Sequence, residues 1–96
     1  MECQTLISGD VATIILPKEF SFNTRNEFRL ALKEKKSAYE VDFQRVEKMD
    51  SAAFGMLLLL KEGSNDKKVS VVFKNVRPEV LRMLQLIKFD QVFTIL

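Results

Sequence analysis

The chain has 96 residues, of which 47% are hydrophobic and 29% charged, enough for one domain with a modest core. Its 15 Lys and Arg residues against 13 Asp and Glu residues leave a formal net charge of +2, which does not favour nucleic acid as a partner. The absence of His excludes Ser-His-Asp and Cys-His catalytic sets and His-bearing zinc sites, and a single Cys excludes an internal disulfide.

No segment has the length or composition of a targeting or membrane-spanning sequence. The longest apolar run, Ala52 to Leu60, is far shorter than the roughly 18 residues that span a bilayer. The three Gly residues are too scattered for a phosphate-binding loop. We therefore expect a cytoplasmic protein of one domain, residues 1–96, with no cofactor, no metal and no direct membrane insertion.

The first half of the chain predicts a hairpin followed by a helix and a strand. Met1–Ile7 is a weak strand and Val11–Leu16 a stronger one, with Ser8-Gly9-Asp10 as the turn between them. A helix is expected over Asn23–Lys36 and a strand over Tyr39–Phe43, where apolar and acidic residues alternate.

Two local signals support the helix over Asn23–Lys36. Thr24 and Glu27 have the three-residue spacing of a capping box. The expected buried face carries Phe28, Ala31 and Leu32.

The second half predicts two further helices and two strands. The helices are Ser51–Glu62, stopped by Gly63, and Pro78–Lys88, which has Pro in its first turn and Val80, Leu84 and Ile87 on one face. The strands are Val69–Phe73 and Val92–Leu96. This order predicts an α/β domain with a mixed, mostly parallel sheet of about four to five strands packed with three or four helices.

The segment from Val46 to Met56 carries the strongest functional signal. A strand ends, a short loop follows, and Asp50-Ser51 stands where a helix that is apolar almost all round begins. Such a helix needs cover from the sheet and its neighbours, or from a partner. The N–H groups at its start would suit a phosphate on Ser51, although either Asp50 or Ser51 could equally serve as an ordinary helix cap.

The element order and the segment Met49–Gly55 resemble a STAS domain of the bacterial anti-sigma factor antagonist group. In that family the segment usually reads Asp-Ser-Ser/Thr-Gly-Leu-Gly, and Ser51 matches the phosphorylated Ser. The resemblance extends to Asn75–Val80 and Phe89–Phe93 near the C-terminus. Phe20–Phe22 is similar to the lead into the first helix, particularly in the biofilm and motility subgroup.

The resemblance implies a binding protein under phosphorylation control and not an enzyme. The unphosphorylated form would bind a serine kinase or anti-sigma factor, phosphorylation of Ser51 would release it, and a cognate serine phosphatase, alone or fused to a response regulator, would restore it. The residues expected near the partner-facing surface, some of them buried, are Asp50, Ala52, Ala53, Phe54, Met56, Asn23 and Ser21.

Four residues depart from the family pattern or leave alternatives open. Ala52 and Ala53 replace a hydroxyl residue and Gly, which leaves the helix intact but could alter recognition by a kinase. Ser21 stands where many members carry an Asp. Asn23 is either a polar neighbour of the site or a residue that starts the helix.

Other candidate sites have simpler structural explanations. Asp42 and Asp50 are acids near the loop, but nothing identifies a catalytic pair. Cys3 is expected to be an inert thiol, and the lysines at positions 33, 35, 36, 67 and 68 are expected to be solvated. The alternative function is a STAS subunit of a lipid-transporting ABC system that needs no phosphorylation; a nucleotide-binding STAS protein is a third possibility, for which no phosphate loop is present.

Overall fold

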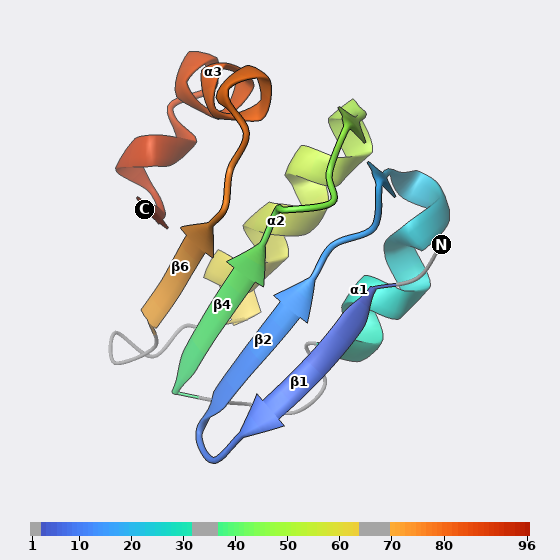
Figure 1. Cartoon of the computed structure of the whole chain (residues 1–96), viewed down its shortest axis with the longest axis vertical. Coiled ribbons are helices and arrows are strands. Elements are labelled where there is room, and N and C mark those ends of the chain that lie inside the picture. The colour runs from blue at the N-terminus through green and yellow to red at the C-terminus, as the bar shows by residue number, and fades with distance from the viewer. Residues whose placement is uncertain (1–2, 32–36, 64–69) are drawn as a thin grey trace.

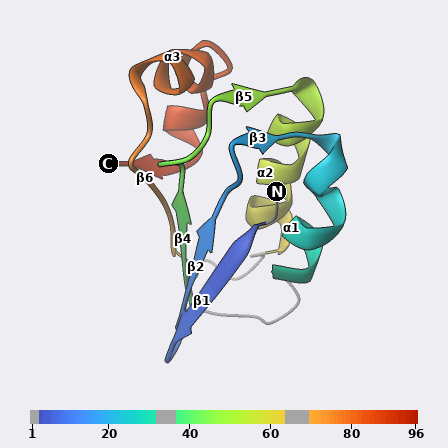
Figure 2. The same cartoon turned by 45° about the vertical axis from the view of Figure 1, so that its right-hand side comes forward.

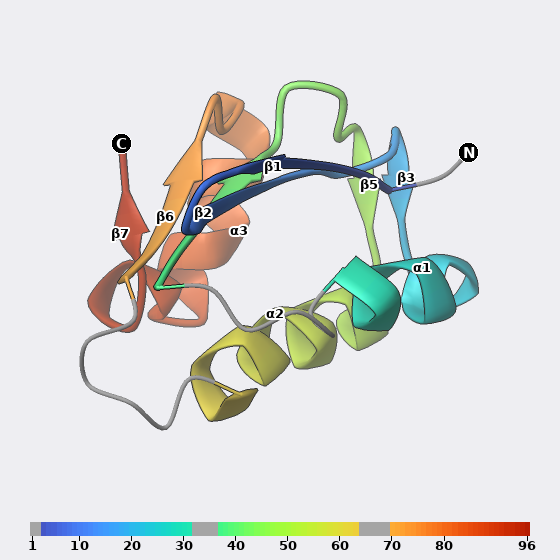
Figure 3. The same ribbon diagram turned by 90° about the horizontal axis from the view of Figure 1, so that it is seen from below.

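The structure is a computed structural model that describes residues 3–31, 37–63 and 70–96. Five strands form the main sheet in the order β1-β2-β4-β6-β7 (Figures 1 and 3). They are β1 (Gln4–Ser8), β2 (Val11–Ile15), β4 (Ala38–Asp42), β6 (Ser70–Lys74) and β7 (Thr94–Ile95). β1 and β2 are antiparallel and every other neighbouring pair is parallel, which confirms the mixed, mostly parallel sheet.

The helices lie beside this sheet and at its end. α1 (Arg25–Ala31) and α2 (Ser51–Gly63) cover one face (Figures 2 and 3), and α3 (Pro78–Leu86) lies beyond the end of β6. Two short 3-10 turns, η1 (Phe22–Thr24) and η2 (Phe89–Gln91), precede α1 and follow α3. The chain therefore has the α/β architecture that its sequence predicts.

The core lies between the covered face of the sheet and the helices. Ile14, Val41 and Phe73 are paired across β2, β4 and β6, and all three are fully buried. Their neighbours along each strand lie on the opposite face of the sheet, where Thr13, Glu40 and Val72 are half-buried because none of the described helices covers that face. Alternation with a period of two therefore gives the sheet one buried apolar face and one half-exposed face.

A chain of aromatic rings joins the helices to β6. Phe73 lies 4.9 Å from Phe43 and 4.6 Å from Phe93, measured between ring centroids. Phe89 continues this chain to Phe93 at 5.5 Å and to Phe54 of α2 at 6.0 Å. Because these contacts link elements from both halves of the chain, the C-terminal turn η2 is part of the core.

The capping box predicted at Thr24 and Glu27 is wrong. The box lies three residues earlier: the N–H of Asn23 donates to the Ser21 hydroxyl oxygen at 3.3 Å, and the N–H of Ser21 donates to the Thr24 hydroxyl oxygen at 3.3 Å. The turn η1 inserts before α1, so Thr24 closes the box instead of opening it.

Other boundaries differ by a few residues. The predicted last strand begins at Thr94 instead of Val92, because the N–H groups of Val92 and Phe93 bond back to the Phe89 carbonyl oxygen in the turn that follows η2. Ile87, expected in the core, is 41% exposed beyond the end of α3. Two short strands, β3 (Glu19–Phe20) and β5 (Lys48–Met49), were not predicted. The predictions made for Met1, Leu32 and the five solvated lysines fall outside the described residues.

The prediction that the run Leu57–Leu60 belongs to the core is confirmed for Leu57 and Leu60, whereas Leu58 is 39% exposed. Within the described residues no helix has both the length and the apolar character that crossing a membrane requires.

We expect Phe73→Ala to lower the free energy of unfolding by about 3–5 kcal/mol, because it removes a fully buried ring that touches two others. Urea titration followed by circular dichroism measures the change. Leu86→Ala is the matched control, since this side chain is 78% exposed, and its effect should stay within about 0.5 kcal/mol. Equal losses in the two variants would contradict the core described above.

Candidate functional site

The site is assembled by a short parallel pairing outside the main sheet. β3 follows β2 and β5 follows the loop after β4, and Phe20 is paired with Met49 (Figure 2). The N–H groups of Glu47 and Lys48 donate to the carbonyl oxygen of Lys18 at 2.8 and 3.2 Å. This pairing places the start of η1 next to the start of α2, at the end of the sheet where the parallel strands finish, which is where open α/β sheets commonly bind ligands.

Asp50 caps α2. The sequence allowed either Asp50 or Ser51 as the cap, and the structure shows that it is Asp50. The N–H of Ala53 donates to its Oδ1 at 2.9 Å, the usual bond of a helix cap. The N–H of Phe22 donates to its Oδ2 at 3.3 Å, from a residue 28 positions away. Asp50 therefore orders the loop as well as the helix.

Ser51 is the first residue of α2 and is exposed. Because Asp50 supplies the cap, the Ser51 hydroxyl makes no hydrogen bond to any other residue that the structure describes. The hydroxyl stands at the positive end of a 13-residue helix. Its position leaves it open to modification, and a phosphate there would meet a favourable field.

The structure divides the seven residues predicted near the partner-facing surface into two groups. Asp50 and Asn23 are exposed, and Ala52 and Phe54 are half-buried. The other three are buried, as was expected for some members of the group: Ala53 is fully buried, Met56 is 5% exposed and Ser21 is 7% exposed.

The buried members of the group support the site from beneath. Ala53 and Met56 belong to the hydrophobic core. The Ser21 side chain accepts the N–H of Asn23, so both residues start η1, and the Thr24 hydroxyl donates to the Ser21 carbonyl oxygen at 2.8 Å. These bonds fix the backbone around Ser21, and the N–H of the next residue, Phe22, donates to Asp50.

Sequence reasoning missed Phe22. Phe22 is 52% exposed, its backbone N–H bonds to Asp50, and the guanidinium of Arg25 lies 4.0 Å from the ring centroid, a cation–π contact. Gly55 and Leu58, one and two turns below Ser51, are also exposed. No local signal in the sequence separates Phe22 from Phe20, which is equally apolar, lies two residues earlier and is fully buried.

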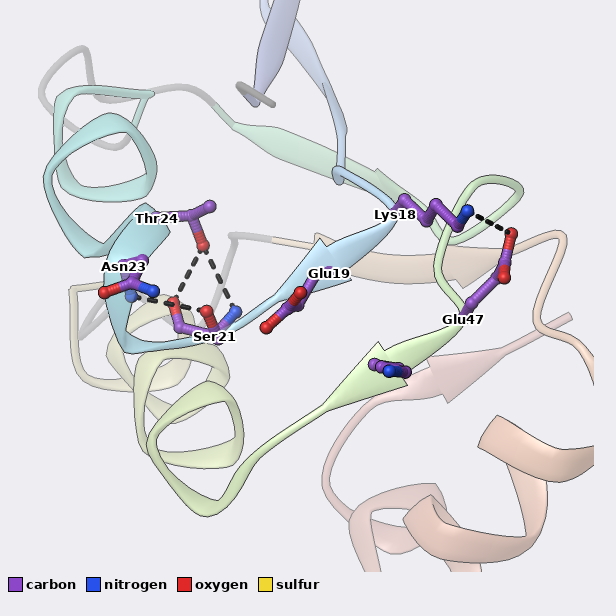
Figure 4. A pocket seen from close by; sticks show the side chains of 7 residues that line it. Lys18, Glu19, Ser21, Asn23, Thr24 and Glu47 are labelled. Atoms are coloured by element: carbon purple, nitrogen blue, oxygen red, sulfur yellow. Dashed lines mark hydrogen bonds and ion pairs between the residues drawn. The ribbon is translucent and has the colours of Figure 1, made fainter.

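A pocket of about 580 Å³ lies beside η1, β3 and β5 (Figure 4). Seven residues with polar or charged side chains line it: Lys18, Glu19, Ser21, Asn23, Thr24, Glu47 and Lys48. The ammonium of Lys18 lies 3.8 Å from the Glu47 carboxylate, and the lining carries two positive and two negative side chains in all. No group of three or more His, Cys, Asp or Glu residues is arranged for a metal within the described part of the chain.

Asp42, the other acid considered from the sequence, has a structural role. Its Oδ1 accepts the N–H of Gln44 at 2.9 Å and the side-chain amide of Asn75 at 3.1 Å, which ties the end of β4 to the end of β6.

The fold and this site define the class of protein. Residues 7–96 match the family model described as the Mlab STAS domain. The chain is also 32% identical over 90 residues to a STAS-domain-containing protein of Pseudomonas aeruginosa, a match that covers 91% of this chain and 89% of the relative. The chain belongs to the STAS domain family.

Solved structures of anti-sigma factor antagonists share the fold. An anti-sigma factor antagonist (STAS) domain protein from Planctomyces limnophilus has a TM-score of 0.86 at 17% identity, covering 99% of this chain and 89% of that one. The phosphorylated form of the Bacillus cell fate determinant SpoIIAA has a TM-score of 0.72 at 16% identity, covering 98% of this chain and 90% of that one.

We expect Asp50→Ala to destabilise the protein by about 1–2 kcal/mol, because it removes the acceptor of the Ala53 and Phe22 N–H groups. Asp50→Asn should recover most of the loss, since an amide oxygen also caps a helix. Thermal unfolding of both variants measures the difference. Equal stability of wild type and Asp50→Ala would contradict the role assigned to this carboxylate.

Burial of the Cys3 thiol, reinforced by the negative charge of Glu27, raises its pKa to about 12. At about pH 8 we expect alkylation by iodoacetamide to be on the order of 100-fold slower in the native protein than in urea, because the reactive thiolate is on the order of 1000-fold scarcer, an effect that the greater nucleophilicity of the more basic thiolate offsets in part. The folded state holds the Cys3 thiol proton more tightly than the unfolded state does. The free energy of unfolding therefore falls as the pH rises from about 9, where the thiol of the unfolded chain ionises. Mass spectrometry of labelled samples measures the rates, and rapid native labelling would contradict the burial.

Proposed function

We propose that this chain is a phosphorylation-controlled anti-sigma factor antagonist, a binding module that is acted upon and is not itself an enzyme. Unphosphorylated, it binds a regulatory partner with a serine-kinase or anti-sigma module; phosphorylation of Ser51 releases the partner, and a serine phosphatase reverses the modification. The observation that carries the proposal is the exposed Ser51 hydroxyl at the start of α2, which the Asp50 cap leaves unused.

The composition of the segment supports Ser51 as the single acceptor. Between Gln44 and Leu60 it is the only residue that bears a hydroxyl, because Ala52 and Ala53 stand where the family pattern has a hydroxyl residue and Gly. Ala53 is fully buried against the core. A kinase that reaches the start of α2 therefore meets one hydroxyl.

The electrostatics of the site support a release of the partner without a loss of fold. Phosphorylation adds about −1.5 to −2 charge units, and the positive end of α2 accepts an anion. A partner that covers Ser51 would also cover the half-buried Phe54 and the exposed Phe22, both apolar. Removing a dianion from water against that apolar surface is costly unless the partner supplies cations, so the complex weakens.

The comparisons support the proposal at the level of the fold. The structural neighbours include anti-sigma factor antagonists, and one of them, SpoIIAA, has been solved in a phosphorylated form. For this chain, we propose that the partner carries a serine-kinase or anti-sigma module and that Ser51 is the residue phosphorylated.

The test is phosphorylation by candidate serine kinases with ATP, with the site mapped by mass spectrometry. We expect phosphate on Ser51 in the wild type, none in Ser51→Ala, and unchanged incorporation in Ser70→Ala, a matched control because Ser70 is also exposed. Affinity for the kinase or anti-sigma partner should fall at least about tenfold on phosphorylation, or about 1.4 kcal/mol.

Ser51→Asp should reproduce part of the loss of affinity, whereas Ser51→Ala should keep the affinity of the unphosphorylated protein. If both variants bind every partner as the wild type does, the switch is wrong.

That last outcome would favour the second candidate, a STAS subunit that binds its partner without phosphorylation, as in a lipid-transporting ABC system. The observation that supports this second candidate is the exposed strip of Gly55 and Leu58, which continues along α2 from Ser51. A partner docked on this strip would depend on apolar contact, so Leu58→Lys and not Ser51→Asp would abolish binding.

A further inference from the structure

The β1 strand forms a free edge of the main sheet. It is bonded to β2 on one side, no described element pairs with its other side, and all five of its residues are exposed (Figure 1). The opposite edge is β7, which has two residues. β1 therefore offers the longer row of open backbone groups, and such an edge readily pairs with another strand.

The sequence of β1 lacks the features that usually protect an edge. Gln4–Ser8 contains no charged residue and no Pro, although charges, Pro or bulges normally discourage edge pairing. Leu6 is 59% exposed and Ile7 is 48% exposed. The edge is thus apolar as well as open.

The hairpin register identifies which backbone groups face outward. Ser8 pairs with Val11 across a two-residue turn, in which Gly9 has a φ of 58°. The pair that closes such a turn is hydrogen-bonded, and hydrogen-bonded pairs then alternate along an antiparallel ladder. Ser8, Leu6 and Gln4 therefore bond to β2. The N–H and C=O groups of Thr5 and Ile7 point away from the sheet.

We propose that two copies of this chain associate through antiparallel pairing of β1 with β1, about a two-fold axis at Leu6. In this register Thr5 of each copy exchanges backbone hydrogen bonds with Ile7 of the other. The two Leu6 side chains face each other in a non-hydrogen-bonded pair, where side chains lie closest. The two five-stranded sheets become one continuous sheet.

Self-complementarity argues for a second copy as the occupant. A two-fold interface uses one patch twice, so it must not set like charges against each other, and β1 carries none. The flanking charges are complementary. Arg45 donates to Gln4 at 3.3 Å at one end of β1, and the exposed Asp10 follows the other end. Antiparallel pairing brings the Arg45 end of each copy toward the Asp10 end of the other.

Sedimentation equilibrium of the full chain tests the proposal, at concentrations up to about 1 mM because small interfaces are weak. We expect a monomer–dimer equilibrium in the wild type. Leu6→Lys should raise the dissociation constant at least about tenfold, since it sets two ammonium groups opposite each other. Leu86→Lys, at another exposed Leu, should leave it unchanged. A wild type that stays monomeric, or a Leu6→Lys variant that dimerises normally, overturns the proposal.

A second variant tests the register and does not depend on how a Lys is tolerated. In a Cys3→Ser background, Leu6→Cys places two thiols across the axis, where the Cα atoms of a non-hydrogen-bonded pair lie about 4.5 Å apart and a disulfide can form. Under mild oxidation it should form a covalent dimer at least about tenfold faster than Leu86→Cys in the same background. Equal rates would overturn the axis at Leu6, whether or not the proposed phosphorylation of Ser51 occurs.

Discussion

The Asp50 carboxylate holds together two segments that are 28 residues apart, because its two oxygens accept the N–H groups of Ala53 and Phe22. One bond starts α2 and the other fastens the turn before α1 to it. An acid in this place satisfies two backbone donors that would otherwise be open. Because Asp50 caps α2, the Ser51 hydroxyl does not serve as the helix cap. The accessible hydroxyl and the ordered loop around it are thus consequences of one residue.

The short β3–β5 pairing makes this arrangement possible. Both strands have two residues, and their pairing brings the segments that follow β2 and β4 side by side at the site. Buried residues then support the site, with Ser21 holding η1 and Ala53 seating α2 on the core. The surface left above them is small and combines a hydroxyl, a carboxylate and an aromatic ring. Such a surface is suited to docking against another protein.

Prediction from sequence succeeded where a pattern repeats along the chain. The alternation of Tyr39, Val41 and Phe43 placed all three in the core, and Pro78 marked the first turn of α3. It failed where a short-range signal had more than one solution. Thr24 fits the first or the last position of a capping box, and only the geometry of η1 assigns it to the last. The two-residue strands β3 and β5 carry no periodicity and were not predicted.

The sequence by itself determined the α/β order of elements, the apolar faces, the start of α2 at Asp50-Ser51 and the absence of His chemistry. These follow from local propensity, periodicity and residue type, which act over a few positions. The tertiary structure decided which of Asp50 and Ser51 caps the helix, which of the seven residues near the site are exposed, and that Phe22 stands beside them. Each depends on a contact between distant segments, such as the bond from Phe22 to Asp50, and no local pattern encodes such a contact.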